Sequence, residues 1–164
     1  MMEALQLWLQ STKLAWFVIH YSWVWSVCET VHFIGLSLLV GVILLIDLRM
    51  LGMAKQVPFS ALYQLLPWAI FGFVLNTVTG VMFIAAAADQ YLHNPAFYLK
   101  MLFIFLAGIN VFMFYMTGIS RKVEVLGPGD EAPGAAKAVA AISIFLWFGV
   151  ILWGRLMPFL GLQF

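Results

Sequence analysis

The sequence predicts an all-α integral membrane protein, a four-helix bundle with an N-terminal amphipathic helix that lies in the membrane interface. Hydrophobic residues make up 65% of the 164 residues and charged residues only 9%, whereas a soluble domain is roughly half apolar and a quarter charged. The mean hydropathy is +1.03. Four apolar runs are each long enough, at about 20 residues, to cross a bilayer as a helix. The whole chain, residues 1–164, therefore forms one membrane domain.

The N-terminal segment, residues 1–23, differs from the rest because it mixes Leu, Trp and Phe with Glu, Gln, Ser and Lys. Leu5, Trp8 and Leu9 fall near helical spacing, which favours an amphipathic helix in the membrane interface. The alternative is a short fifth span over residues 14–25, which is short and rich in aromatic residues typical of the interface. No basic stretch followed by a small-residue cleavage site begins the segment, so we expect no cleaved signal peptide.

The apolar runs that follow are the predicted spanning helices, at about residues 25–46, 66–88, 97–119 and 139–160. The connection between the third and fourth helices, residues 120–138, is polar and rich in Gly and Pro, so it is predicted to be flexible.

Positive charges predict the orientation of these helices, since Lys and Arg concentrate in cytoplasmic loops. With four spans, the basic residues that follow the first and third helices all lie on one side: Arg49, Lys55, Arg121, Lys122 and Lys137. We expect that side to be cytoplasmic and both termini periplasmic, in a bacterial inner membrane.

Ionisable residues inside the predicted spans are the best indication of function. Glu29, His32, Lys100 and Arg155 come from three helices, and a rise of ~1.5 Å per residue places all of them in the outer third of the membrane. Such residues usually face the interior of a bundle. Glu29 and His32 are three apart and share a face with Gly35. A glycine there leaves room for a backbone or a flat ligand to approach.

Each of these residues has a structural interpretation and a functional one. His32 either hydrogen-bonds a neighbouring helix or ligates a metal or haem iron. Glu29 either pairs with Arg155 or Lys100, or accepts the second ring N–H of His32. Lys100 extends to the headgroups, pairs with Glu29, or acts as a neutral amine ligand. Arg155 needs an anionic partner, such as Glu29 or a haem propionate. Asn76 and Thr79 on the second predicted helix lie deeper, and Thr79 is interpreted as a packing contact.

Several segments occur together in an informative order: "ETVHFIGLSLLVG", "DLRMLG", "LLPWAIFGF", "TG", "FYLKMLFIFLAGIN" and "WGRL". Over residues 25–157 the chain resembles a family of small bacterial four-helix membrane proteins that carry a domain of unknown function. It is more distantly similar to the membrane proteins grouped around the copper-resistance protein CopD and the protoporphyrinogen oxidase HemJ. Because those oxidases have a His early in one helix and a Lys near the start of a later one, the similarity implies His32 and Lys100 as axial ligands of a b-type haem. The chain departs from the nearer family at Tyr115, where a His is expected, and this puts a second haem in doubt.

The sequence therefore favours a membrane protein that binds b-type haem and passes electrons between the periplasmic side and the membrane. His32 and Lys100 are the predicted iron ligands, and Arg155, Glu29 and Gly35 the predicted cofactor contacts. The alternatives are a copper or other metal-ion binding or transport protein, and a structural membrane subunit without a cofactor. Whether the chain is an enzyme stays open.

The expected partners are the lipid bilayer, a quinone or a periplasmic redox partner, and further copies of the chain. A net charge of +1 gives no electrostatic basis for nucleic-acid binding. Cys28 is the single cysteine, which excludes an internal disulfide.

Overall fold

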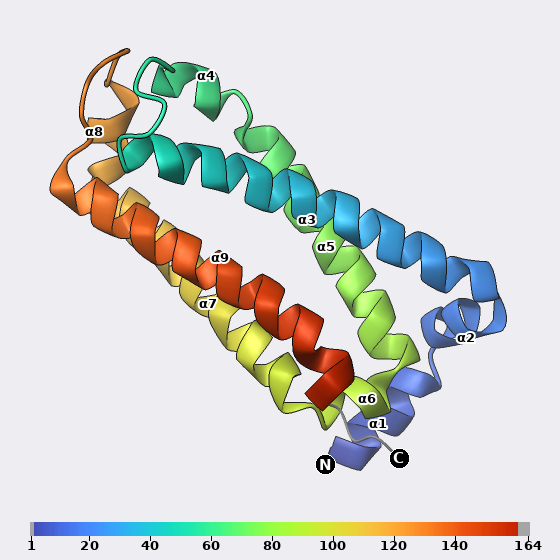
Figure 1. The fold of residues 1–164 in the computed structure, drawn as a ribbon. Coiled ribbons are helices and arrows are strands. Elements are labelled where there is room, and N and C mark those ends of the chain that lie inside the picture. The colour runs from blue at the N-terminus through green and yellow to red at the C-terminus, as the bar shows by residue number, and fades with distance from the viewer. Residues whose placement is uncertain (1, 161–164) are drawn as a thin grey trace.

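The computed structural model describes residues 2–160, and these residues form helices and loops with no strand (Figure 1). Four helices are long and apolar enough to cross a membrane: α3 (Ser22–Met50), α5 (Leu66–Ala86), α7 (Pro95–Met116) and α9 (Gly134–Leu160). The shorter helices are α1 (Met2–Gln10), α2 (Lys13–His20), α4 (Phe59–Tyr63), α6 (Ala88–Leu92) and α8 (Ile119–Glu124). The prediction of an all-α protein with four apolar spans is confirmed at this level.

The ends of the long helices differ from the predicted ones. α3 ends at Met50 rather than at residue 46, and α9 begins at Gly134 rather than at residue 139. The backbone hydrogen bonds of α3 continue past the apolar run, since the Leu51 N–H donates to the Asp47 carbonyl at 2.9 Å. Asp47 and Arg49, which lie beyond the predicted end of the first span at residue 46, therefore belong to a helix and are buried.

The N-terminal segment is helical, but it forms two short helices rather than one. Thr12 separates them and caps α2, because its Oγ1 accepts the Ala15 N–H at 3.2 Å. The chain breaks again at Tyr21, between α2 and α3, so no fifth span forms over residues 14–25. Val18 is buried in a cluster with residues of α3 and α5, which anchors α2 to the end of the first long hairpin.

The long helices associate as two antiparallel pairs, α3 with α5 and α7 with α9 (Figure 1). Glycines permit the close approach within each pair. A Cβ added to Gly72 on α5 would lie 2.5 Å from the Gly35 carbonyl oxygen of α3 and 2.8 Å from the Leu39 nitrogen. In the second pair, a Cβ on Gly149 would lie 2.1 Å from the Phe103 ring. Both pairs therefore depend on a position that has no side chain.

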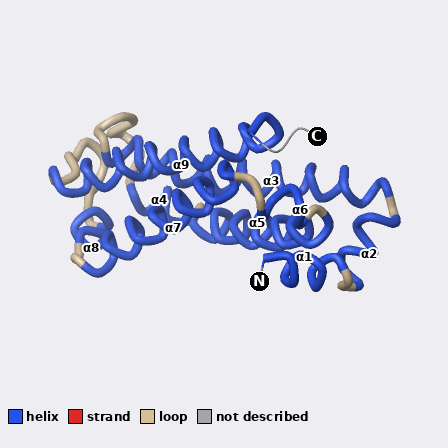
Figure 2. The backbone as a smooth tube through the Cα atoms, turned by 90° about the horizontal axis from the view of Figure 1, so that it is seen from below, coloured by secondary structure: helices blue, strands red, loops and turns tan. Residues whose placement is uncertain are grey.

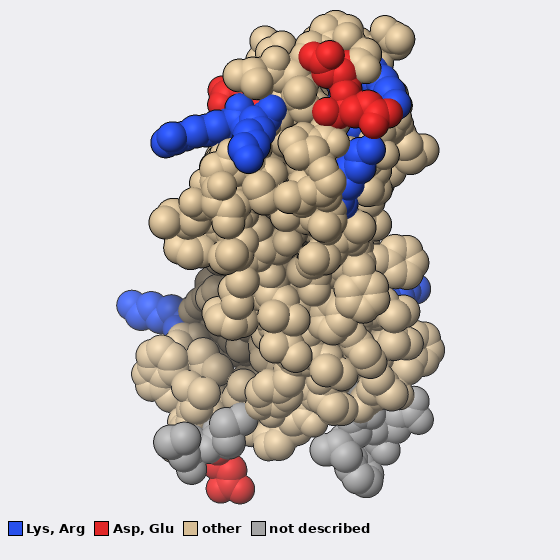
Figure 3. All heavy atoms as spheres, turned by 90° about the vertical axis from the view of Figure 1, so that its left-hand side faces the viewer, with Lys and Arg blue, Asp and Glu red and all other residues tan. Residues whose placement is uncertain are grey.

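The two pairs meet through α3 and α9, near α4 and α8 (Figures 1 and 2). Val42 and Ile46 of α3 share one buried cluster with Leu146 and Trp147 of α9. We call the end of the molecule formed by α4, α8 and the α8–α9 loop the charged end, because Lys, Arg, Asp and Glu gather there (Figure 3). The opposite end, formed by α2, α6 and the first turns of α3, is called the aromatic end.

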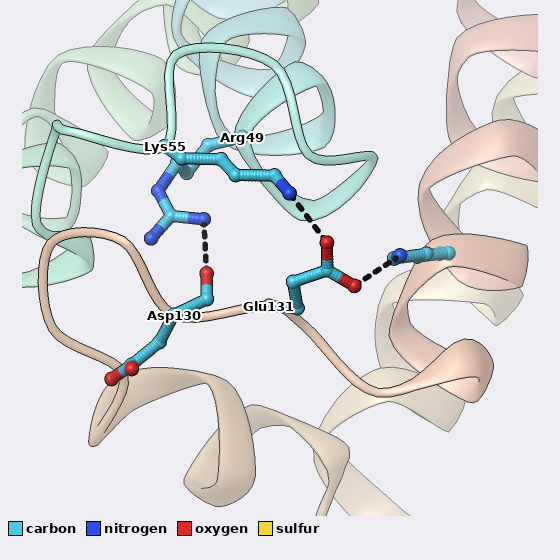
Figure 4. Close-up of polar contacts among 5 residues, drawn as sticks. Arg49, Lys55, Asp130 and Glu131 are labelled. Atoms are coloured by element: carbon cyan, nitrogen blue, oxygen red, sulfur yellow. Dashed lines mark hydrogen bonds and ion pairs between the residues drawn. The ribbon is translucent and has the colours of Figure 1, made fainter.

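A buried arginine fixes the charged end. Arg49 is 1% exposed, and its guanidinium donates to three backbone carbonyls: Val57 at 2.8 Å, Gly127 at 3.0 Å and Asp130 at 3.1 Å. Figure 4 shows the bond to Asp130. Two of these carbonyls belong to the α8–α9 loop, which was predicted to be flexible. Instead, Arg49 ties this loop to the end of α3.

Ion pairs add to the same attachment. Glu131 of the loop pairs with Lys55 and, at 3.4 Å, with Lys137 of α9 (Figure 4). The Gly129 N–H donates to the Lys55 carbonyl at 2.8 Å. These ion pairs are exposed and contribute little to stability by themselves. The buried Arg49 guanidinium is therefore the main contact that holds the loop.

We predict that Gly72→Ala destabilises the first helix pair. The new methyl would overlap the backbone of α3, and overpacking of this kind costs about 1–3 kcal/mol. Denaturation in mixed detergent micelles measures the change. Gly41→Ala is the matched control, because a Cβ there meets nothing within 4 Å. Equal stability of the two variants would contradict the close packing of α3 on α5.

We also predict that Arg49→Lys lowers the free energy of unfolding by about 3 kcal/mol, because an ammonium cannot reach all three carbonyls and each charge-assisted hydrogen bond contributes about 1.5–3 kcal/mol. The same denaturation experiment reports the loss. Arg121→Lys, at an exposed position of α8, should leave stability unchanged. An Arg49→Lys variant with unchanged stability would show that the loop is not held by the guanidinium.

Candidate functional site

His32 lies on the face of α3 that packs on α5. Its Nδ1 is 2.7 Å from the Thr79 Oγ1, and its ring centroid is 5.6 Å from that of Phe83. Both partners are on α5, so the imidazole is held between the two helices of the first pair. The side chain is half-buried. The hydrogen bond to a neighbouring helix that the sequence allowed is therefore present.

The hydrogen bonds of Thr79 determine which ring nitrogen of His32 carries the proton. The Thr79 hydroxyl has one proton, and it donates that proton to the Leu75 carbonyl at 2.7 Å. Its oxygen must then accept from His32, so Nδ1 carries the hydrogen. When the imidazole is neutral, this arrangement leaves the lone pair on Nε2, directed away from Thr79. Such a nitrogen can ligate a metal ion or accept a further hydrogen bond.

The space beside Gly35, which was expected to admit either a backbone or a flat ligand, is taken up by α5, so Gly35 is not a cofactor contact here. A Cβ on Gly35 would lie 2.9 Å from both the Asn76 Nδ2 and the Gly72 carbonyl oxygen. The Asn76 amide is fixed there because it donates to the Gly72 carbonyl at 3.0 Å. Gly35 therefore serves helix packing in this structure, and any ligand of His32 must approach from elsewhere.

Lys100 comes from the second helix pair. It is half-buried along Gly154 of α9, where an added Cβ would lie 3.6 Å from the Lys100 Nζ. Arg155, the next residue on α9, is exposed. The structure thus places His32, Lys100 and Arg155 at the aromatic end, as the helix order predicts.

Glu29 does not form the ion pair that the sequence suggested. It is exposed and accepts a hydrogen bond from the Trp25 Nε1 at 3.1 Å. Within residues 2–160, neither Lys100 nor Arg155 pairs with a carboxylate. Glu29 lies instead near Tyr91 of α6, where burial and then the Glu29 charge raise the pKa of the Tyr91 hydroxyl.

The remaining histidines are separate from this site. His20 stacks on Trp16 with ring centroids 4.5 Å apart, and the His93 Nδ1 donates to the Asp89 carbonyl at 3.0 Å. No three His, Cys, Asp or Glu side chains in the described part of the chain lie together as metal ligands. A metal site built from His32, Glu29 and His20 is therefore not formed by these residues alone.

Thr79 is the site residue whose role the sequence did not reveal. It was interpreted as a packing contact, because a threonine in an apolar helix carries no signal of its partner. The Thr79 hydroxyl proton is used in the bond to the Leu75 carbonyl four residues earlier. The packing of α3 on α5 then brings His32 to the Thr79 oxygen.

The model of a family of unknown function (DUF6644) matches residues 6–160 of the chain. The match covers nearly the whole chain, so the protein belongs to this family. No curated protein and no solved structure matches the chain. The more distant likeness to the CopD and HemJ proteins stays a prediction.

We predict that His32 is the Nδ1–H tautomer, and that Thr79→Val removes this preference by deleting the acceptor. Nitrogen-15 chemical shifts of the imidazole in the protein, purified in mild detergent without added cofactor, distinguish the tautomers. Thr77→Val is the control, since the exposed Thr77 hydroxyl bonds only the Phe73 carbonyl of its own helix. A wild-type Nε2–H tautomer would contradict the assignment.

Proposed function

We propose that the protein binds a b-type haem at the aromatic end, with the His32 Nε2 as an axial ligand. The observation that carries the proposal is the 2.7 Å contact between the His32 Nδ1 and the Thr79 hydroxyl, which itself donates to Leu75. This contact assigns the proton to Nδ1 and leaves Nε2 available to a ligand. Histidines that ligate metals commonly donate their second ring N–H to a neighbouring acceptor, which fixes the tautomer and the ring orientation. A bound haem would supply one-electron redox chemistry.

Lys100 is the proposed second ligand, and Arg155 the proposed partner of a propionate. Lys100 is half-buried on the opposite helix pair, and an amine ligates in its neutral form. Arg155 follows Gly154 on α9 and is exposed, so its guanidinium is free to bind a carboxylate. Glu29 lies at the same end, where it offsets these positive charges. Gly35 is not assigned a cofactor contact, because α5 covers it.

In this proposal the protein passes electrons between a periplasmic donor and the bacterial inner membrane. The site lies near one end of the spanning helices, where a donor outside the bilayer can approach. The chain would supply the axial nitrogen, the orientation of that nitrogen through Thr79, and the charges that hold the propionates.

The visible spectrum tests the proposal. We expect the protein, purified in mild detergent from cells that make haem, to show a Soret band and, after dithionite, α and β bands. His32→Ala should abolish them, and Thr79→Val should weaken haem retention about 10- to 100-fold. His20→Ala and His93→Ala are matched controls, because both side chains are engaged elsewhere.

The rival functions give different results in the same preparation. Copper without a Soret band would overturn the haem proposal in favour of a metal-ion protein. A colourless preparation with neither iron nor copper by elemental analysis would leave a structural subunit. A Soret band that persists in His32→Ala would show that haem binds through another residue.

We further propose that the four long helices form a bundle in the membrane with α1 and α2 in its outer interface. Exposed apolar side chains on these short helices, such as Leu7, Trp8 and Trp16, support this position. The basic residues of the charged end favour a cytoplasmic location for that end. Reporter fusions within residues 125–133 should therefore report a cytoplasmic location, and a periplasmic signal would invert the orientation.

A further inference from the structure

A cavity of about 430 Å³ lies between the four long helices in the half of the molecule nearer the charged end. Most of its lining is apolar, with Leu39 of α3, Ala69 of α5 and Phe114 of α7 among the lining residues. Asp47, Tyr63 and Trp147 also line it, and they come from α3, α4 and α9. The cavity is separate from the His32 site, whose residues do not line it.

The polar residues of the cavity have atoms without partners. The Asp47 Oδ2, the Tyr63 hydroxyl and the Trp147 Nε1 are buried and make no hydrogen bond in the described structure. Asp47 is only 4% exposed and Trp147 only 9%. Leaving such groups unpaired costs about 1–3 kcal/mol each, and three of them around one cavity indicate a ligand that satisfies them.

The types of these atoms restrict the ligand. A phenol hydroxyl and an indole N–H are donors, so the ligand must present acceptor oxygens. If the Asp47 carboxyl is ionised, its free oxygen needs a donor, such as a hydroxyl on the ligand. If it is protonated, it donates and needs a further acceptor oxygen on the ligand. A fatty acyl chain offers none of these groups. A ring that carries oxygens on opposite edges matches polar atoms that reach the cavity from different helices.

The cavity is open to the membrane on one side. Ile70 and Phe73 of α5 and Val111 and Tyr115 of α7 line it and are also exposed. These two helices make at most marginal contact with each other, because each packs mainly on its own partner. A lipid-soluble molecule could therefore reach the cavity sideways and leave a long apolar tail in the bilayer.

We propose that this cavity binds a membrane quinone or quinol, with ring oxygens bonded by Tyr63 and Trp147 and a ring hydroxyl by Asp47. The binding site is argued from the cavity alone. Its use as the exchange point for electrons rests on the proposed haem function. Leu39, which lines the cavity, is seven residues from His32 on α3, about 10 Å along the helix axis.

Quinone binding can be measured with decylubiquinone on the purified full-length protein, as saturable quenching of tryptophan fluorescence and as a rise in the melting temperature. We expect Tyr63→Phe and Trp147→Phe each to weaken decylubiquinone binding about tenfold, the effect of losing one hydrogen bond. Asp47→Asn should weaken the binding of decylubiquinol by a similar factor, because only the reduced form has a ring hydroxyl that donates to the carboxylate. The matched controls Asp89→Asn, Tyr98→Phe and Trp68→Phe lie outside the cavity lining and should bind like the wild type.

A cavity-filling variant gives an independent test. Gly108 lines the cavity, and a Cβ there meets nothing within 4 Å, so Gly108→Leu should fill the space without disturbing the fold and abolish binding. Gly41→Leu is its control, since Gly41 is equally unobstructed and lies outside the cavity. If Asp47→Asn fails to fold, Gly108→Leu still tests whether quinone binds in the cavity.

The same titration on His32→Ala separates this inference from the haem proposal, because that variant keeps the cavity. Binding to His32→Ala at wild-type affinity supports the quinone site even if the protein proves to hold no haem. Unsaturable quenching, or equal affinity in Gly108→Leu and Gly41→Leu, would mean that quinone only partitions into the detergent and would overturn the proposal.

Discussion

The contact between Arg49 and the α8–α9 loop is the constraint on which the rest of the structure depends. Each helix pair is held internally by close packing, and within residues 2–160 the pairs meet mainly through the α3–α9 contact and the connections at their ends. Arg49 adds two hydrogen bonds across this junction, to Gly127 and Asp130, from a side chain that is almost fully buried. A buried guanidinium cannot lose its charge, so removing its acceptors would leave an unpaired cation. Because the guanidinium needs these carbonyls, it fixes the position of the α8–α9 loop, and with it the second pair, relative to α3.

The candidate site and the cavity lie at different depths of this arrangement. His32 is held within the first pair by Thr79, and Lys100 lies at the same end of the second pair, along Gly154. The cavity lies on the other side of Leu39, where both pairs contribute to its wall. The helix α3 therefore connects the His32 site with the cavity. A redox function would use this helix as the shared scaffold of an electron donor site and an acceptor site.

Much of the fold could be predicted from the sequence, because a bilayer admits few solutions for four long apolar runs. The ionisable residues of the aromatic end were predicted for the same reason, since helix order alone brings His32, Lys100 and Arg155 to one end. Asp47 was missed because hydropathy ended the first helix at residue 46, whereas its hydrogen bonds continue to Met50. Gly35 was assigned to a ligand because sequence spacing identifies a face of a helix but not its neighbour. In the structure α5 packs on that face and leaves no space for a ligand beside Gly35.

The division into two pairs also bears on how the chain is assembled in the membrane. Helices that are consecutive among the long ones pack on each other, so each hairpin can form from residues close in sequence as soon as its second helix is inserted. The bonds from Arg49 to Gly127 and Asp130 span 78 and 81 residues. They can form only after the third long helix has emerged and the loop beyond it has returned to α3. Until then the guanidinium has no carbonyls from that loop, which makes the joining of the hairpins a late event in biogenesis.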